Sequence, residues 1–187
     1  MAIDTFADVS SELFTKLAHK RLGVPEQNII HVSENATAGV LRGRISTLLN
    51  RLEENDTLYI YYAGHGVPGE KGKSAYILPK DAVVGAYKDP DFKLSRIYQK
   101  IKDSDVGRAY AFIDACFSGQ SSPDQQIFEG VAPAGRTVQA MQEKRVPGNM
   151  TIITAGKSNQ LSNAYEDKKN RLFSYFLMKG ILKKRRR

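Results

Sequence analysis

Apolar positions follow two spacings along the chain, and the changes between them predict the order of its elements. From Phe6 to Leu17 apolar residues recur every three or four positions, which is helical spacing, and Gly23 and Pro25 follow as stop signals. The same spacing predicts further helices over residues 37–53, 94–101 and 172–182.

Short apolar and β-branched runs between these helices predict strands over residues 28–32, 57–62, 74–78, 109–115 and 150–155. The runs are apolar on both faces and alternate with helices. This pattern predicts an α/β domain, a three-layer sandwich in which helices flank a mostly parallel central sheet. Residues 120–149 are rich in proline and glycine, and we expect a flexible loop there.

A length of 187 residues fits one domain, which we place at residues 1–182, followed by a basic tail over residues 183–187. The content of 41% hydrophobic and 26% charged residues is typical of a globular domain. No stretch reaches the roughly 18 consecutive apolar residues of a membrane-spanning helix. The first residues lack the basic and apolar regions of a secretory signal, so we expect no membrane span and a cytoplasmic location.

The formal net charge of +8 is mainly a property of the tail, which holds five of the 28 basic residues. The other 23 basic residues nearly balance the 20 acidic ones. Such a run can contact nucleic acid or an anionic membrane, but a solvated terminus is the interpretation we favour. No nucleic-acid partner is therefore expected.

Metal and disulfide chemistry find little support in the sequence. Cys116 is the single cysteine, so no intrachain disulfide or cysteine cluster can form, and the three histidines lack zinc-ligand spacing. Asp89 and Asp91 are close, but the sequence Asp-Pro-Asp is more typical of a turn than of a calcium site. We expect no metal and no cofactor, and calcium dependence has no support here.

Two residues that carry chemistry follow predicted strands. His65 comes after residues 57–62 and Cys116 after residues 109–115, and the carboxyl ends of parallel strands meet at one sheet edge. A cysteine nucleophile reacts as the thiolate and needs a base, which His65 can supply. The N–H groups of Gly66 and Cys116 are candidate oxyanion donors. A lone cysteine is more often a small core residue, but the pair at one edge favours catalysis.

Residues 61–66 (YYAGHG) and 112–119 (FIDACFSG) resemble the histidine and cysteine motifs of caspase-like peptidases, most closely bacterial caspase homologues and metacaspases. His65 precedes Cys116 by 51 residues, near the separation of about 50 in caspases. Further similar segments are residues 22–29 (LGVPEQNI), 76–81 (YILPKD) and 172–177 (LFSYFL). The resemblance spans nearly the whole chain and implies a caspase-like fold and a cysteine endopeptidase with a Cys–His dyad.

Asp114 lies two residues before Cys116, where animal caspases have a glutamine. An aspartate at this place in metacaspases lines the pocket for the first substrate residue. The resemblance therefore implies substrate binding by Asp114 and cleavage of proteins or peptides after Arg or Lys, because a carboxylate attracts a basic side chain. The alternative is that Asp114 accepts hydrogen bonds from nearby N–H groups and holds the turn.

The resemblance also raises two expectations, one about the loop after Cys116 and one about the start of the chain. A processing or gating loop over residues 120–149 makes Arg136, Lys144 and Arg145 candidate positions of self-cleavage. Family members begin with an apolar strand inside the sheet, whereas here the first helix opens within ten residues of Met1. We expect the fold to lack that first strand, with an N-terminal segment or a partner chain completing the sheet.

Two other functions stay open. A catalytically inactive caspase-like module acting in interaction or regulation is favoured by the missing first strand and opposed by the intact motifs around His65 and Cys116. A nucleic-acid-binding protein rests only on the basic tail.

Overall fold

A four-stranded mixed sheet forms the centre of the computed structural model, which describes residues 6–69, 74–83, 85–117, 120–122, 125–126, 148–155 and 164–183. The strand order is β2-β1-β3-β6. β1, β3 and β6 run parallel, and β2 joins antiparallel, so the predicted mostly parallel sheet is confirmed. The strands are β1 (Thr57–Pro68), β2 (Ala75–Ile77), β3 (Arg108–Cys116) and β6 (Met150–Thr154).

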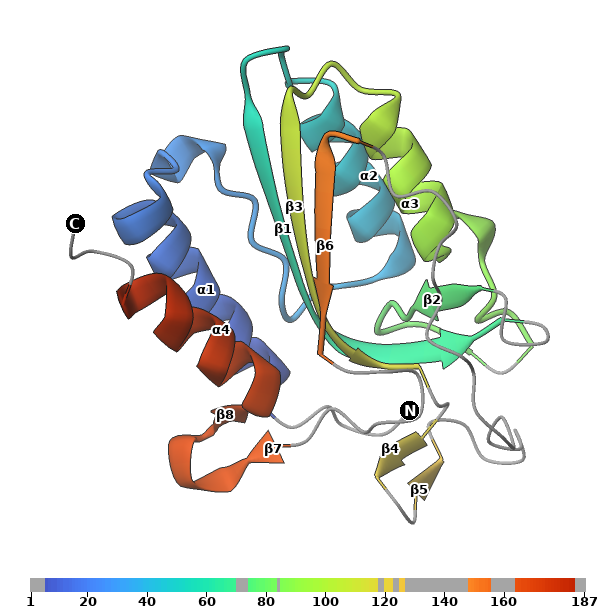
Figure 1. Cartoon of the computed structure of the whole chain (residues 1–187). Coiled ribbons are helices and arrows are strands. Elements are labelled where there is room, and N and C mark those ends of the chain that lie inside the picture. The colour runs from blue at the N-terminus through green and yellow to red at the C-terminus, as the bar shows by residue number, and fades with distance from the viewer. Residues whose placement is uncertain are drawn as a thin grey trace.

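Helices cover both faces of this sheet. α1 (Ala7–Leu22) and α4 (Leu172–Lys183) lie on one face, and α2 (Ala38–Leu49) and α3 (Leu94–Lys102) lie on the other (Figure 1). This is the predicted α/β sandwich of three layers. None of the helices in the described ranges is both long and apolar enough to cross a membrane.

Shorter elements connect these layers. They are the 3-10 turns η1 (Glu26–Asn28), η3 (Pro90–Phe92) and η4 (Glu166–Lys168), and the two-stranded pairs β4 (Gln120–Ser122) with β5 (Gln125–Gln126) and β7 (Ala164–Tyr165) with β8 (Asn170–Arg171). The segment predicted as a flexible loop, residues 120–149, thus includes an antiparallel pair. α4 extends to Lys183, so the first residue of the predicted basic tail lies in a helix.

Local sequence explains where α1 ends and where α2 begins, whereas α2 ends at Leu49, four residues before its predicted end. α1 stops at Gly23, which has a left-handed φ of 78° and donates its N–H to the carbonyl of Ala18. α2 begins at Thr37, whose side-chain oxygen accepts the N–H of Val40 as an N-cap. Both signals agree with the boundaries expected from the sequence.

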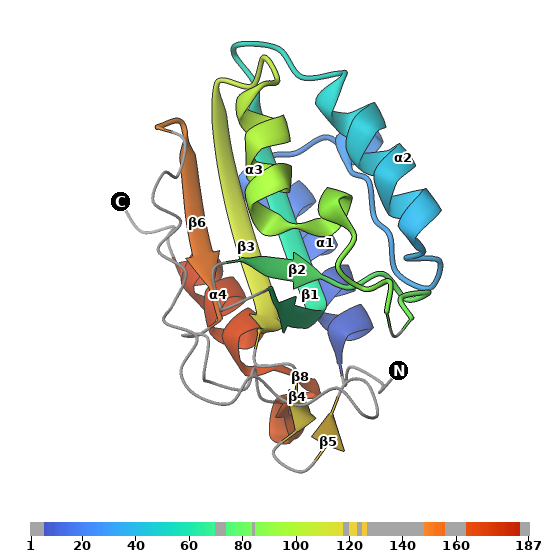
Figure 2. The same cartoon turned by 90° about the vertical axis from the view of Figure 1, so that its right-hand side faces the viewer.

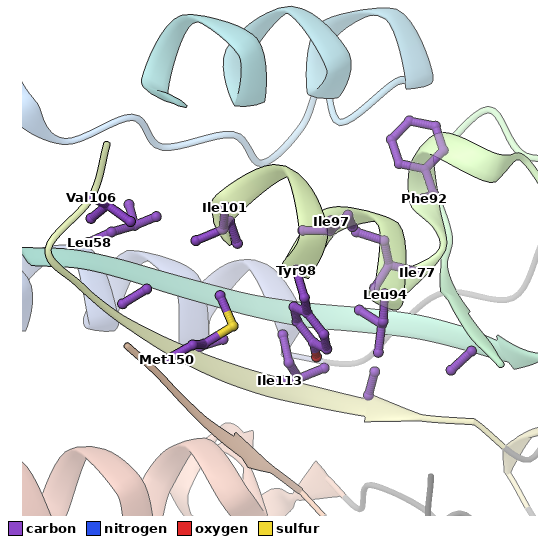
Figure 3. Close-up of a cluster of buried hydrophobic side chains, with 14 residues drawn as sticks. Leu58, Ile77, Phe92, Leu94, Ile97, Tyr98, Ile101, Val106, Ile113 and Met150 are labelled. Atoms are coloured by element: carbon purple, nitrogen blue, oxygen red, sulfur yellow. The ribbon is translucent and has the colours of Figure 1, made fainter. Parts of the chain in front are cut away.

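The core has two parts because β3 alternates its side chains between the two helical layers. Ala111 and Ile113 belong to the cluster under α3, where Ile101 is 1% exposed (Figure 3). Phe112 belongs to the cluster under α1 and α4, with Phe14 and Met178 among its other members. Residues on alternate sides of one strand therefore face different layers.

Two strand predictions need correction. Residues 28–32 form no strand, since η1 runs to Asn28 and the following residues are extended without a ladder partner among the described residues. These residues and residues 57–65 of β1 line the same cavity, and the two segments do not pair in the described part of the chain. β1 does not end at Tyr62, because its residues pair with β3 as far as His65 and then with β2 as far as Pro68.

Candidate functional site

His65 and Cys116 are direct register partners in the parallel ladder of β1 and β3. Neighbouring strands lie about 4.8 Å apart, and residues that face each other across a ladder direct their side chains to the same side of the sheet. His65 lies inside β1 and not beyond its end, and Cys116 is the last residue of β3. The sheet itself therefore brings these two residues together, while their catalytic roles stay a prediction.

The two residues share one face of the sheet with the cluster under α1 and α4. Cys116 and Asp114 follow Phe112 at every second position of β3, and Phe112 packs in that cluster. Cys116 is 9% exposed, so the thiol lies at the margin of the core. A mostly buried thiol is oxidised slowly, and it needs a nearby base to form the thiolate.

Gly66 is required by close packing beside the pair. A Cβ atom at this position would lie 2.4 Å from the ring of Phe117 and 3.0 Å from the carbonyl oxygen of Cys116. Any side chain here would displace the ring or the backbone that follows Cys116. The two candidate oxyanion donors, Gly66 and Cys116, therefore lie close together, and their role as donors stays a prediction.

Tyr62 holds the backbone of His65 in place, a role that the sequence analysis did not assign. Its hydroxyl donates to the His65 carbonyl at 2.7 Å and lies 3.3 Å from both the N and O atoms of Leu78. Leu78 N–H also donates to the His65 carbonyl, at 3.1 Å. Gly64 makes room for the ring, because a Cβ there would lie 2.7 Å from the Tyr62 hydroxyl. Burial raises the pKa of Tyr62 well above its ordinary value, so the hydroxyl stays a donor.

Asp114 is fully buried, and its carboxylate is engaged by the junction of β8 and α4. Oδ1 lies 3.1 Å from Nε of Arg171, and Oδ2 accepts the Ser174 N–H at 3.2 Å and the Ser174 hydroxyl. Nη2 of Arg171 also donates to the Asp114 carbonyl at 3.0 Å. In the described residues Asp114 thus takes part in an internal ion pair, and its predicted contact with substrate remains untested.

This ion pair is the centre of a larger buried polar cluster. The hydroxyls of Tyr61 and Ser174 lie 2.5 Å apart, and the Ser10 hydroxyl donates to Asn170 at 2.6 Å. Burial raises the pKa of Tyr61 well above its usual range and lowers the pKa of Arg171 to about 10. Arg171 stays charged at neutral pH, since even the lowered pKa lies far above 7.

No signal near Asp114 in the sequence identifies its partners, because Arg171 and Ser174 lie 57 and 60 residues away. The one available hint is the position of Ser174 in the otherwise apolar run 172–177. A polar residue on the packed face of a helix needs a hydrogen-bond partner inside the protein. Pairing it with Asp114 required the tertiary structure.

The remaining candidate positions lie outside this cluster. Arg136, Lys144 and Arg145 fall outside the described residues. Asp91 accepts from Arg42 at 2.9 Å and from Lys100 at 2.8 Å, and these hydrogen bonds, that of Lys100 most, lower the pKa of its carboxyl. Within the described ranges, no group of three or more His, Cys, Asp or Glu side chains is placed to hold a metal ion.

Comparison with known proteins identifies a family and also finds distant likenesses among solved structures. The family model for the caspase domain of peptidase C14 matches residues 8–186. No curated protein matches the sequence. Among solved structures, protein GSU0716 from Geobacter sulfurreducens is similar at 18% identity and a TM-score of 0.43, over 60% of this chain and 41% of that one. This chain thus spans about two fifths of the length of that protein.

Proposed function

The chain belongs to the caspase-domain family of peptidase C14, and from this membership we propose that it is a cysteine endopeptidase with Cys116 as nucleophile and His65 as general base. The observation that carries the proposal is the direct register pairing of these two residues in the sheet. A nucleophile and its base must come within hydrogen-bond reach of each other, and register partners on adjacent strands extend their side chains to the same side from backbones about 4.8 Å apart.

The reaction is an acyl transfer in two steps. His65 accepts the proton of the Cys116 thiol, and the thiolate attacks the scissile carbonyl carbon, while the N–H groups of Gly66 and Cys116 stabilise the oxyanion. Protonated His65 gives its proton to the leaving amine as the peptide C–N bond breaks. Water then attacks the thioester, which releases the carboxylic acid and restores the thiol.

We also propose that the enzyme cleaves after Arg or Lys, with Asp114 as the attracting group. For this specificity, Arg171 must first leave its ion pair with Asp114. Because Arg171 neutralises the Asp114 carboxylate, a basic substrate side chain meets a net negative charge only when Arg171 withdraws. Selectivity for basic residues therefore measures how freely Arg171 leaves Asp114.

The test is a set of fluorogenic peptides that end in Arg, Lys, Asp or Leu before the fluorophore, assayed with and without calcium. We expect cleavage after Arg and Lys by the natural chain and at least a thousandfold loss in Cys116→Ala and His65→Ala. Cleavage after Asp or Leu only would keep the enzyme and remove the proposed role of Asp114. Equal activity of the natural chain and Cys116→Ala would end the proposal.

A second candidate function is a catalytically inactive caspase-like module, and one observation favours it. Within the described residues, β1 has β3 on one side, but no strand lies along its other side between residues 57 and 64. The rate of alkylation of Cys116 by iodoacetamide at pH 7 separates the two candidates. An activated thiolate reacts faster than a model thiol, and that excess disappears in His65→Ala, whereas an inactive module reacts more slowly than the model thiol in both proteins.

Self-cleavage after Arg136, Lys144 or Arg145 is a further part of the proposal, and it rests on the family resemblance alone. We expect the intact mass of active protein to reveal a cut in residues 120–149 that Cys116→Ala lacks. A single uncut mass in both proteins would exclude it.

We place the enzyme in a reducing, cytoplasmic compartment, because the nucleophile must stay a free thiol.

A further inference from the structure

Exposed apolar side chains gather on one helical layer of the molecule. Five of the eight large hydrophobic residues that are exposed in the described part of the chain belong to α1 and α4: Val9, Leu13, Leu172, Phe176 and Leu182. A patch of such residues, unlike a single one, marks an interaction surface. α1 and α4 form the outermost layer on their side of the sheet (Figure 1), and Figure 2 shows α2 and α3 on the opposite side.

The two helices of this layer lie side by side and begin at the same end. The Ser10 hydroxyl, near the start of α1, donates to the Asn170 side chain just before α4 at 2.6 Å. The N–H of Arg171 donates to the same hydroxyl at 3.3 Å. From this common start both helices run in the same direction (Figure 1), so equivalent turns of α1 and α4 are neighbours.

Both helices carry the same pattern along one stripe. At positions i, i+4, i+7 and i+11 the exposed residues are Val9, Leu13, Lys16 and Lys20 in α1, and Leu172, Phe176, Lys179 and Lys183 in α4. This spacing aligns residues along one side of a helix. In α4 that side lies opposite the buried Ser174 and Met178, so the stripe points away from the sheet. Each stripe begins apolar and ends basic.

The stripe of α1 lies on the flank nearer α4. Ser11 and Thr15 of α1 line the cavity beside β1, and Val9 and Leu13 are two positions earlier, about 200° around the helix. The cavity adjoins β1, whereas α4 packs over the neighbouring strand β3. The two stripes therefore belong to one outer surface, which we call the α1–α4 surface and define by these eight residues and Leu182.

The layer is basic as well as apolar. Its two helices contain five Lys or Arg residues and two acidic residues, Asp8 and Glu12. Asp8 accepts a hydrogen bond from Ser33 at 2.7 Å and lies 4.0 Å from Lys80. Residues 166–169 add two acidic and two basic side chains, which cancel, and residues 172–187 contain six basic residues and no acidic one. Charge complementarity therefore requires an anionic partner.

We propose that the α1–α4 surface docks on an anionic phospholipid membrane and lies on it without crossing it. Acyl chains accept the exposed apolar side chains, and anionic headgroups attract the lysines. The alkyl stems of the lysines can lie along the apolar region while their ammonium groups reach the headgroups. Tyr175 packs edge to face with Phe176 at 5.2 Å and has Lys179 Nζ 5.5 Å from its ring, and tyrosines are enriched at the headgroup level.

Nucleic acid is the other anionic partner that a basic surface can bind, but the side chains here favour lipid. Single-stranded nucleic acid binds through its phosphates and through bases that stack on aromatic rings. Four of the five exposed apolar residues of this surface are aliphatic. The Phe176 ring already stacks on Tyr165 at 6.4 Å and has Lys179 Nζ 5.9 Å from its centroid, so these groups compete with a base. The inference holds whether or not Cys116 is catalytic.

The test measures sedimentation of the full chain with lipid vesicles. One set of vesicles is phosphatidylcholine alone, and the other contains about one third phosphatidylserine as the anionic lipid. We expect saturable binding to the anionic vesicles, which weakens as the salt concentration rises, and at least tenfold weaker binding to the neutral ones.

One pair of double variants tests the apolar contacts. Leu13→Ser with Phe176→Ser should weaken binding to anionic vesicles about tenfold or more, because it removes two apolar side chains from the surface. Val40→Ser with Val83→Ser changes two apolar residues that are 37% and 60% exposed outside the layer, and it should bind like the natural chain. The melting temperature of each variant confirms that it is folded.

A second pair of double variants tests the lysines. Lys16→Gln with Lys179→Gln should weaken binding about tenfold, because each basic residue near an anionic membrane adds to the attraction. Arg96→Gln with Lys102→Gln removes the same charge from exposed positions of α3, in the opposite helical layer, and should have less than a twofold effect.

A fluorescent reporter locates the contact. The chain contains no tryptophan, so Phe176→Trp introduces a single one in the α1–α4 surface. Its emission should shift to shorter wavelength on anionic vesicles and should be quenched by lipids that are brominated in their acyl chains. Val83→Trp places the same reporter outside the layer and should show neither change.

Four results would overturn the proposal. Equal binding to both sets of vesicles, or none to either, would exclude an anionic lipid partner. Binding that survives Leu13→Ser with Phe176→Ser but is lost when residues 184–187 are all replaced by glutamine would assign the contact to the basic run alone. Quenching of the Phe176→Trp reporter by single-stranded DNA, but not by vesicles, would assign the surface to nucleic acid. Self-association that Leu13→Ser with Phe176→Ser abolishes would assign it to a second copy.

Discussion

Individual glycines and one tyrosine determine how closely the backbone around His65 is packed. Gly64 leaves space for the ring of Tyr62, whose hydroxyl then reaches the carbonyl of His65. Gly66 leaves space for the ring of Phe117, the residue that follows the end of β3. The histidine is thus flanked by glycines because two aromatic side chains occupy the places where side chains at these positions would lie.

Gly66→Ala should destabilise the protein by about 1–3 kcal/mol, the usual cost of forcing an added carbon into a packed site. The added Cβ would meet the Phe117 ring at 2.4 Å. Removing that ring with Phe117→Ala should lower the penalty of Gly66→Ala in the double variant. Urea unfolding measures both.

The control for this experiment is Gly180→Ala on α4, where a Cβ would have no atom within 4 Å. Alanine is a better helix former than glycine, so this change should be neutral or stabilising by up to about 1 kcal/mol. If Gly66→Ala had the same effect as Gly180→Ala, the close contact with Phe117 would not exist in solution.

Tyr62→Phe should have an effect on stability that depends on alkaline pH. Burial raises the pKa of Tyr62, so the folded protein keeps this proton above pH 10 while the unfolded chain releases it. Ionisation then favours the unfolded state, and the stability that Tyr62 contributes below pH 10 is lost as the pH rises. The difference in unfolding free energy between the natural chain and Tyr62→Phe should fall by about 1.4 kcal/mol per pH unit above 10.

Comparing the two proteins cancels every other group that titrates in this range, including Arg171, whose pKa is lowered to about 10 by burial. Urea unfolding at several pH values from 8 to 11 supplies the measurement. A difference that stays constant from pH 8 to 11 would mean that the Tyr62 hydroxyl is exposed to water in solution.

At the level of elements, the junction of β8 and α4 is joined to β3 through buried charge. Arg171 is the last residue of β8 and Ser174 lies in the first turn of α4, and both contact the Asp114 carboxylate. Helix α4 is therefore positioned over β3 by polar contacts as well as by its apolar face. A buried carboxylate that loses its cation is left uncompensated in a medium of low polarity.

Arg171→Met should destabilise the protein by about 3–5 kcal/mol, because it leaves the Asp114 charge without its partner. Asp114→Asn in the same chain removes that charge and should restore a large part of the loss. Thermal and urea unfolding of the two single variants and the double variant give the coupling. Additive losses in the double variant would show that the two side chains do not interact.

Helices were easier to predict than strands for a physical reason. A helix satisfies its hydrogen bonds within a few residues, so the apolar spacing and the caps at Thr37 and Gly23 suffice to locate α1 and α2. A strand exists only where a partner lies beside it. Residues 28–32 have a strand-like composition but no described partner, and β1 continues through the glycines near His65 because β2 and β3 pair with it there.

The whole molecule is organised around β3, the strand that has a neighbour on each side over most of its length. We expect its amides to exchange with solvent most slowly, close to the rate set by global unfolding. Amides of β1 that face the open edge should exchange much faster, because they lack a strand partner. Hydrogen exchange followed by mass spectrometry or NMR tests this order, and equally slow exchange along both edges of β1 would show that the edge is covered in solution.

The sequence was sufficient to predict the layers of the fold and that His65 and Cys116 lie close together in the sheet, although not that β1 continues beyond His65, because layers and neighbouring strands depend on the order of elements along the chain. Long-range partners could not be predicted in this way. The contacts of Asp114 with Arg171 and of Tyr61 with Ser174 join segments separated by 57 and 113 residues. Nothing local to either residue specifies which of many distant polar groups it meets.

The ladder between β1 and β3 has a consequence for how such a protein can diverge. His65 and Cys116 are held at their separation by backbone pairing that continues for nine register pairs, from Thr57 with Arg108 to His65 with Cys116. That spacing does not depend on the side chains of the connections around it, which are free to vary in length and composition. Descendants of this chain can therefore acquire new selectivity through those connections while the spacing of thiol and imidazole is inherited unchanged.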